Sequence, residues 1–158
     1  MTDQDTQFMR RAIALARAGM DSGVGGPFGC VIAKDGKIIG EGSNQVTSTN
    51  DPTAHAEVVA IREACKTLNT FQLDGCSIYT SCEPCPMCLG AIYWARPAQV
   101  FFACTREDAA AVGFDDDLIY NELALPNADR QRVMISLLRD EGVALFDAWA
   151  AKPDKIEY

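Results

Sequence analysis

Three cysteines within seven residues constrain this chain more than any other feature of its sequence. Cys82, Cys85 and Cys88 stand three residues apart, and the chain has seven cysteines in all. Because that number is odd and we expect a reducing compartment, the pattern argues against a disulfide framework. Crowding of this kind is typical of a metal site or a catalytic site. The fold therefore has to build such a site around this segment.

Length and composition predict one globular domain. The chain has 158 residues, of which 48% are hydrophobic, with 12 glycines and 7 prolines. This apolar fraction supports a core and excludes a disordered or collagen-like chain. The longest apolar runs, about six residues, are too short to span a membrane. The polar, acidic start lacks the features of a secretory signal. We expect a cytoplasmic protein with a single domain over residues 1–158, of which 152–158 form a tail.

The charge balance bears on the partners of the protein. Fourteen basic residues stand against 22 acidic ones, a formal net charge of −8, and the densest basic cluster is the pair Arg10 and Arg11. Nucleic-acid binding requires clustered Lys and Arg to neutralise phosphates. The sequence therefore argues against a nucleic-acid partner and favours a small neutral substrate.

Hydrophobic periodicity predicts alternating helices and strands. We expect helices over residues 5–19, 53–68 and 140–151, with a further one that follows Cys88 and ends before Pro97. We expect strands over residues 28–33, 37–43, 77–80, 100–104 and 133–138. Thr53 is the expected N-cap of its helix, and the almost wholly apolar strand 100–104 is expected to be buried on both faces. The pattern predicts an α/β fold, a three-layer α/β/α sandwich around a mixed sheet of about five strands.

Two motifs about thirty residues apart carry the chemistry. The first is His55-Ala56-Glu57, which holds the single histidine of the chain, and the second is Pro84-Cys85-Pro86-Met87-Cys88. Two cysteines three residues apart at a helix start lie on one face, and the helix N-terminus favours their thiolate forms. With one imidazole they leave a fourth tetrahedral position for water, which is the catalytic zinc pattern. Glu57 would border the same metal as a proton shuttle.

Cys82 leaves an alternative open. Together with His55, Cys85 and Cys88 it would complete a closed structural zinc site without a position for water. In that case the protein would be a zinc-stabilised binding module with no activity. Such a site has no need of Glu57, so the three-ligand interpretation is favoured, with Cys82 as a packed thiol beside the site.

The motifs closely resemble those of bacterial guanine deaminases, which belong to the cytidine-deaminase-like superfamily. The resemblance covers essentially the whole chain, including its end, KIEY, and is strongest over residues 25–29 (GGPFG), 50–57 (NDPTAHAE), 80–88 (TSCEPCPMC) and 113–116 (GFDD). The zinc motif is common to the superfamily. The GFDD segment and the terminal tyrosine point to the guanine branch.

The resemblance implies a zinc-dependent reaction and its residues. His55, Cys85 and Cys88 would bind one Zn²⁺ per chain, and Glu57 would be the general acid and base. The implied reaction is hydrolytic deamination of guanine to xanthine and ammonia in purine catabolism, with a zinc-bound hydroxide as nucleophile. Alternatives are deamination of cytosine, an aminotriazine, guanosine or a tRNA adenosine, the last disfavoured by the acidic charge.

The resemblance also implies a substrate site. The residues expected to contact the purine are Phe28, Asn44, Ala56 through its backbone amide, Trp94, Asp116 and Tyr158. Asp116 would be a second catalytic acidic group near the base. Tyr158 would close the site from the neighbouring subunit, so the resemblance implies a homodimer that exchanges its C-terminal segment.

Overall fold

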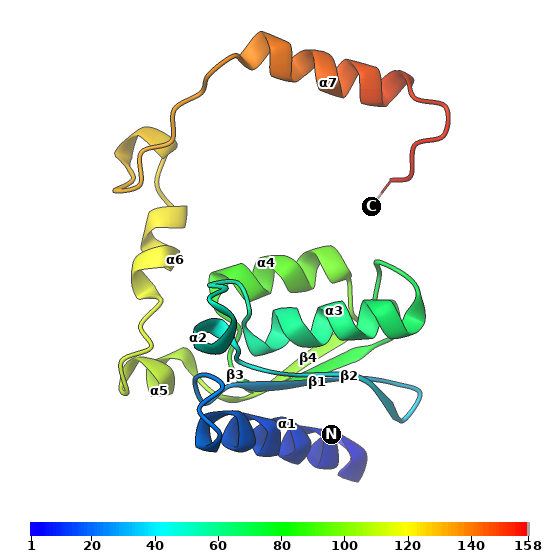
Figure 1. Cartoon of the computed structure of the whole chain (residues 1–158), viewed down its shortest axis with the longest axis vertical. Coiled ribbons are helices and arrows are strands. Elements are labelled where there is room, and N and C mark those ends of the chain that lie inside the picture. The colour runs from blue at the N-terminus through cyan, green and yellow to red at the C-terminus, as the bar shows by residue number, and fades with distance from the viewer. Residues whose placement is uncertain (158) are drawn as a thin grey trace. The chain divides into compact units, whose positions relative to one another are not determined.

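The computed structural model describes residues 1–157 and divides into two compact units, Met1–Asp116 and Asp117–Tyr158 (Figure 1). The first unit contains a four-stranded sheet, whereas the second contains helices and irregular segments. The expectation of one domain over residues 1–158 with a tail at 152–158 stays a prediction. Within the described residues, no helix is both long enough and apolar enough to cross a membrane.

The sheet of the first unit is mixed and has the strand order β2-β1-β3-β4. Its strands are β1 (Gly29–Lys34), β2 (Lys37–Ser43), β3 (Ser77–Cys82) and β4 (Gln99–Cys104). β1 pairs antiparallel with β2 and β3, and β3 pairs parallel with β4. The β1–β2 hairpin turns at Asp35 and Gly36, which both have positive φ, as the sequence indicates.

Helices cover both faces of this sheet (Figure 1). α1 (Asp3–Asp21) lies on one face, and α3 (Ala56–Leu68) and α4 (Pro86–Ala95) lie on the other. The two short helices of this unit are α2 (Val46–Thr49) and α5 (Arg106–Ala110). The predicted three-layer α/β/α architecture is confirmed. Alternation along the strands creates a core on each side, because Ile32 and Ile78 face α3 whereas Val31 and Tyr79 face α1.

A close approach of β2 and α3 places the start of α3 against the sheet. A Cβ atom at Gly42 would lie 2.3 Å from the backbone oxygen of Ala56, the first residue of α3. Only glycine permits this distance. Gly42 therefore allows the segment that holds His55 and Glu57 to pack directly onto the sheet.

Three expectations about the elements are wrong. The N-cap of α3 is His55 rather than Thr53, whose hydroxyl and amide bond the carboxylate of Asp51 instead. β4 is one of the two edge strands, and most of its side chains are exposed rather than buried on both faces. Residues 133–138 form no strand, so the sheet has four strands instead of about five. A short apolar run indicates that a segment is packed against another surface, but it does not show which element forms that surface.

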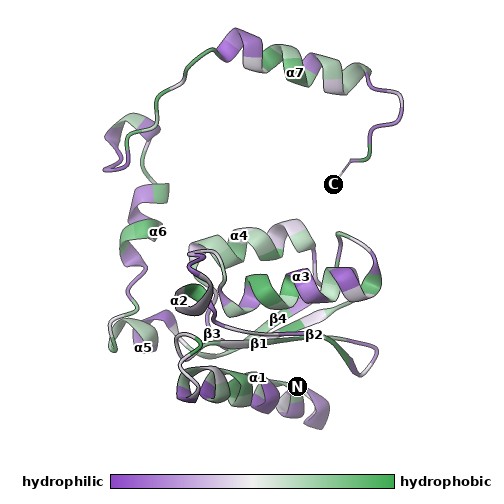
Figure 2. Cartoon of the chain, in the orientation of Figure 1, coloured by the Kyte–Doolittle hydropathy of each residue, from purple (hydrophilic) through white to green (hydrophobic). Residues whose placement is uncertain are grey.

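The second unit has no buried residue among 117–157. It consists of α6 (Asp117–Leu123), a 3₁₀ turn (Asn127–Asp129) and α7 (Arg139–Ala151), which confirms the helix expected over 140–151. Hydrophobic stretches are nevertheless frequent along α6 and α7 (Figure 2). Ile135 and Leu137 are each 83% exposed, and Phe146 is 74% exposed. This unit therefore carries apolar surface that it does not bury by itself.

Candidate active site

Two helix N-termini bring three potential metal ligands together. His55 is the N-cap of α3 and Cys85 is the N-cap of α4, while Cys88 lies in the first turn of α4. Pro86 is the first residue of α4, where its missing N–H costs nothing. The Nδ1 atom of His55 lies 3.6 Å from the Sγ of Cys85 and 3.5 Å from the Sγ of Cys88. The three ligand atoms all lie within 4.8 Å of one another.

This donor set fits zinc. With Zn–S of about 2.3 Å and Zn–N of about 2.05 Å, tetrahedral geometry separates sulfur and nitrogen ligands by about 3.6 Å. The separations of His55 from the two cysteines match this value. Two thiols and one imidazole are ligands that zinc prefers, and three protein ligands leave a fourth position for water.

The electrostatics of the three groups suit metal binding. The hydrogen bond from Cys88 lowers the pKa of the Cys85 thiol to about 4, against the opposing effect of burial. The same bond, followed by burial, raises the pKa of Cys88. The hydrogen bond with Cys85 also raises the pKa of His55. These opposite shifts favour the thiolate form of Cys85, which is the form that binds a metal.

Cys82 stands apart from this group. Among the described residues, the only cluster of ligand atoms with metal-binding spacing consists of His55, Cys85 and Cys88. The Sγ of Cys82 lies 3.6 Å from the backbone oxygen of Thr105, and burial raises the pKa of this thiol to about 11. Cys82 therefore has the environment of a packed neutral thiol.

Glu57 lies beside the three potential ligands. It is in the first turn of α3, its residue is 6% exposed, and its Oε2 atom is 3.4 Å from the Sγ of Cys88. Burial raises the pKa of this carboxyl group. A carboxylate held in such surroundings binds a proton more strongly than it does in water, as proton transfer requires.

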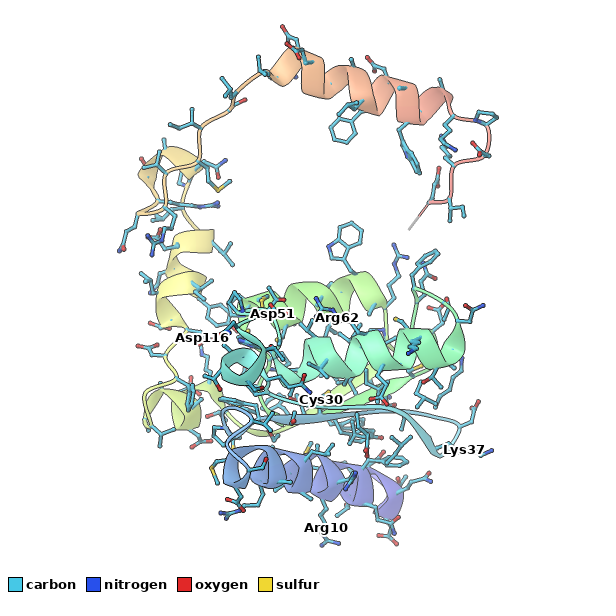
Figure 3. All side chains as sticks on the ribbon, in the orientation of Figure 1. Arg10, Cys30, Lys37, Asp51, Arg62 and Asp116 are labelled. Carbon is cyan, nitrogen blue, oxygen red and sulfur yellow. The ribbon has the colours of Figure 1, made fainter. Side chains whose placement is uncertain are left out.

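A cavity of about 660 Å³ opens onto these groups within the first unit. Its lining includes the predicted residues Phe28, Asn44, His55, Glu57, Cys85 and Asp116. Asp116, which is labelled in Figure 3, has a pKa raised by burial. A volume of this size is in the range of small-molecule sites.

Asn44 is held in a defined orientation at the cavity. Its residue is 8% exposed, and its Oδ1 atom accepts hydrogen bonds from the backbone N–H groups of Gly26 and Val46. A Cβ atom at Gly25 would lie 2.2 Å from the backbone oxygen of Asn44, so this position requires glycine. With its oxygen engaged, Asn44 has its amide nitrogen left to donate to a ligand.

The remaining residues predicted to contact the substrate are Ala56, Trp94 and Tyr158. Ala56 is completely buried at the first position of α3, where a backbone N–H has no partner inside the helix. Trp94 lies on α4, is 64% exposed, and is not one of the residues that line this cavity in the described chain. Tyr158 lies outside the described residues.

The structure adds residues that sequence reasoning missed. Phe114 lines the cavity and packs edge-to-face on Phe28, with ring centroids 4.9 Å apart. Its place in the GFDD segment is the signal that could have singled it out. Glu83 lies in the cysteine motif and also lines the cavity, as does Arg106, for which the sequence offers no signal.

Comparisons with known proteins agree with this geometry. The family profile for the cytidine and deoxycytidylate deaminase zinc-binding region matches residues 2–104. Guanine deaminase of Bacillus subtilis (strain 168) is 56% identical over 151 residues, 96% of this chain and 97% of that protein.

A solved structure is similar over the whole chain. The X-ray structure of guanine deaminase from Bacillus subtilis has a TM-score of 0.95 and 54% identity, and covers 100% of this chain and 99% of its own. A tRNA-specific adenosine deaminase of Aquifex aeolicus is 43% identical over 61% of this chain and 63% of its own. The chain belongs to the zinc-binding family of cytidine and deoxycytidylate deaminases.

Proposed function

We propose that this protein hydrolyses guanine to xanthine and ammonia, as part of purine catabolism. The observation that carries this proposal is the similarity to a guanine deaminase over nearly the entire length of both chains, which includes the second unit. The adenosine deaminase relative matches a shorter part of the chain. The net charge of −8 also disfavours a tRNA substrate.

The reaction replaces the amino group on C2 of guanine by an oxygen from water. Zinc held by His55, Cys85 and Cys88 would lower the pKa of a bound water toward about 7. The Glu57 carboxylate takes a proton from the attacking water and delivers it to the ring nitrogen next to C2. It then passes a second proton to the amino group, which leaves as ammonia. General acid and base catalysis of this kind contributes about 10²–10⁴-fold in rate.

The cavity residues suit a planar purine. Asn44 donates from its amide to an acceptor on the ring, and the buried N–H of Ala56 is a second donor. Phe28 packs against one face of the base. The carboxyl group of Asp116 is an acidic partner for an N–H group of the purine. Unpaired polar groups would remain if the wrong base entered, which discriminates by about 10⁴-fold or more in sites built to pair with a substrate.

A substrate panel tests this function. Ammonia release is measured with guanine, guanosine, cytosine, adenine and an aminotriazine at matched concentrations. We expect guanine to have the largest kcat/KM by a wide margin. An equal value for cytosine would contradict the proposal. Asp116→Asn should lower guanine turnover and retain zinc, whereas unchanged turnover would remove Asp116 from the site.

We also propose that the protein is a cytoplasmic homodimer that exchanges its C-terminal segment. Two observations support the exchange: residues 117–157 bury none of their apolar side chains, and the edge strand β4 of the first unit is exposed. Exchange of identical elements is a low-cost route to a symmetric dimer. The seven free cysteines are compatible with a reducing compartment.

Deletion of residues 156–158 tests the role of the segment's end. In the proposed dimer Tyr158 closes the partner's site and excludes water, so the truncated protein should keep its zinc and lose most of its activity. Light scattering on the full chain should give twice the chain mass. A monomer with full activity would refute the exchange and leave the zinc chemistry unaffected.

A further inference from the structure

A hydroxyl group is buried at the centre of the sheet, where an apolar side chain would be expected. Thr80 lies in β3, paired in register with Cys30 of β1 and Phe102 of β4, and its residue is 1% exposed. Cys30, labelled in Figure 3, and Ile78 are both completely buried. Valine has nearly the same shape as threonine and suits a central strand. A hydroxyl here costs free energy unless it has a hydrogen-bond partner.

The partner of this hydroxyl is Glu57. The Oγ1 atom of Thr80 donates a hydrogen bond to Oε1 of Glu57 over 3.3 Å, and both residues are buried. The second carboxylate oxygen, Oε2, lies 3.4 Å from the Sγ of Cys88. Oε1 is thus hydrogen-bonded to Thr80 in the sheet, whereas Oε2 faces the potential metal ligands.

We infer that Thr80 is a positioning residue for Glu57 in the deamination reaction. Glutamate has three side-chain torsions, so its carboxylate needs an anchor to keep one orientation. β3 is paired on both sides and supplies a rigid one. By holding Oε1, Thr80 leaves Oε2 to take and return the proton. This inference rests on the proposed function, because it assumes that Glu57 moves protons.

The position of Thr80 predicts which kinetic constant changes. Thr80 is not one of the described residues that line the cavity, so it does not touch the base. Its loss should therefore lower kcat and leave KM nearly unchanged. Removal of an outer-shell group that orients a metal ligand typically costs about 10–100-fold in metal affinity or activity, and we expect a loss at the lower end of that range for the orientation of Glu57.

The experiment compares Thr80→Val with Thr80→Ser in the full-length zinc protein. We expect Thr80→Val to lower kcat for guanine about tenfold, with KM within about twofold of wild type. Thr80→Ser retains the hydroxyl and should restore kcat. Zinc content should be equal in all three proteins. Crystal structures provide a readout besides activity: the Glu57 carboxylate should be displaced in Thr80→Val and in place in Thr80→Ser.

Ser81→Ala is the matched control. Ser81 is the next residue of β3, is also buried, and faces the opposite side of the sheet, where its Oγ accepts a hydrogen bond from the N–H of Gly29 over 3.0 Å. Ser81→Ala should lower the melting temperature and leave kcat unchanged. An equal loss of kcat in Ser81→Ala would show that any disturbance of β3 suffices, and would overturn the inference.

The remaining outcomes are also decisive. Wild-type kcat in Thr80→Val, or an unmoved Glu57 in its crystal structure, would refute the positioning role. If Thr80→Val does not fold, Thr80→Ala takes its place. If wild type deaminates another base but not guanine, the proposed substrate fails, and the same variants test Thr80 on that base. If wild type deaminates none of the bases, the proposed function fails. The position of the Glu57 carboxylate in the crystal structures of Thr80→Val and Thr80→Ser then still tests whether Thr80 holds it.

Discussion

The two units of this protein differ in what they bury. Met1–Asp116 has a core on each face of its sheet and contains all of the described residues that line the candidate active-site cavity. Residues 117–157 also include apolar stretches, yet none of these residues is buried. The family profile ends at residue 104, within the first unit. The difference indicates that the first unit supplies the zinc-binding residues, whereas the apolar side chains of the second unit stay exposed unless another surface covers them.

Among the substitutions proposed here, Glu57→Gln should have the largest effect on activity. This effect should come from the chemistry of the first unit alone. An amide has the shape of the carboxylate but cannot carry a proton, so guanine turnover should fall by about 10²–10⁴-fold. Zinc content and oligomeric state should match wild type. The measurement is steady-state ammonia release together with metal analysis. Retention of more than about a tenth of the activity would mean that another group moves the proton.

Cys85→Ser and Cys82→Ser separate the ligands from their neighbour. Purified wild type should contain about one zinc per chain, because three ligands and one open position form a single site. Cys85→Ser should lose zinc and activity, whereas Cys82→Ser should retain zinc, since the Cys82 thiol bonds the backbone of Thr105. Metal analysis decides this. Equal zinc loss in both variants would favour the closed four-ligand site.

Ile135→Lys tests the second unit directly. Ile135 is 83% exposed in the single chain, so a lysine there should be harmless unless a partner covers the position. In the proposed dimer we expect the dissociation constant to rise at least about tenfold, because a charge would be buried without a partner. Ile13→Lys, on the 47% exposed Ile13 of α1, is the control and should leave the dimer intact. Sedimentation at several concentrations measures both, and equal behaviour of the two variants would argue against a covered second unit.

The ion pair between Arg11 and Glu41 should have the smallest effect. The Nε of Arg11 lies 2.7 Å from Oε1 of Glu41, and the hydrogen bond from Arg11 lowers the pKa of that carboxyl group. A lowered pKa means that the pair stabilises the fold above the ordinary glutamate range and that this contribution is lost as the pH falls through the folded-state value. Because both side chains are partly exposed, Glu41→Gln should cost about 0–1 kcal/mol in the free energy of unfolding near pH 7.

The pH dependence of that difference provides the check. Urea unfolding of wild type and Glu41→Gln at pH 7 and at pH 3 should show the gap between them shrink at the lower pH. Activity at pH 7 should not change, because neither residue lines the cavity among the described residues. A gap that widens on acidification would contradict the sign of the shift.

Local sequence determined the main elements and the reactive groups of the first unit. The hairpin at Asp35 and Gly36 and the helix after Cys85 follow from residues close together in the chain, and the two motifs identify His55, Cys85 and Cys88 as the potential metal ligands. The motifs predict them because turn geometry, helix starts and ligand spacing are short-range properties.

Tertiary structure alone decided which apolar segments are covered and which buried polar groups meet. The sequence of β4 does not show that this strand lies at an edge of the sheet. The apolar pattern of residues 133–138 likewise does not show that they form no strand. Likewise, Thr80 and Glu57 lie 23 residues apart, and their hydrogen bond exists only because α3 packs on the sheet that contains β3. Burial and pairing depend on what lies across space, whereas a pattern along the chain reports only that a segment has one apolar face.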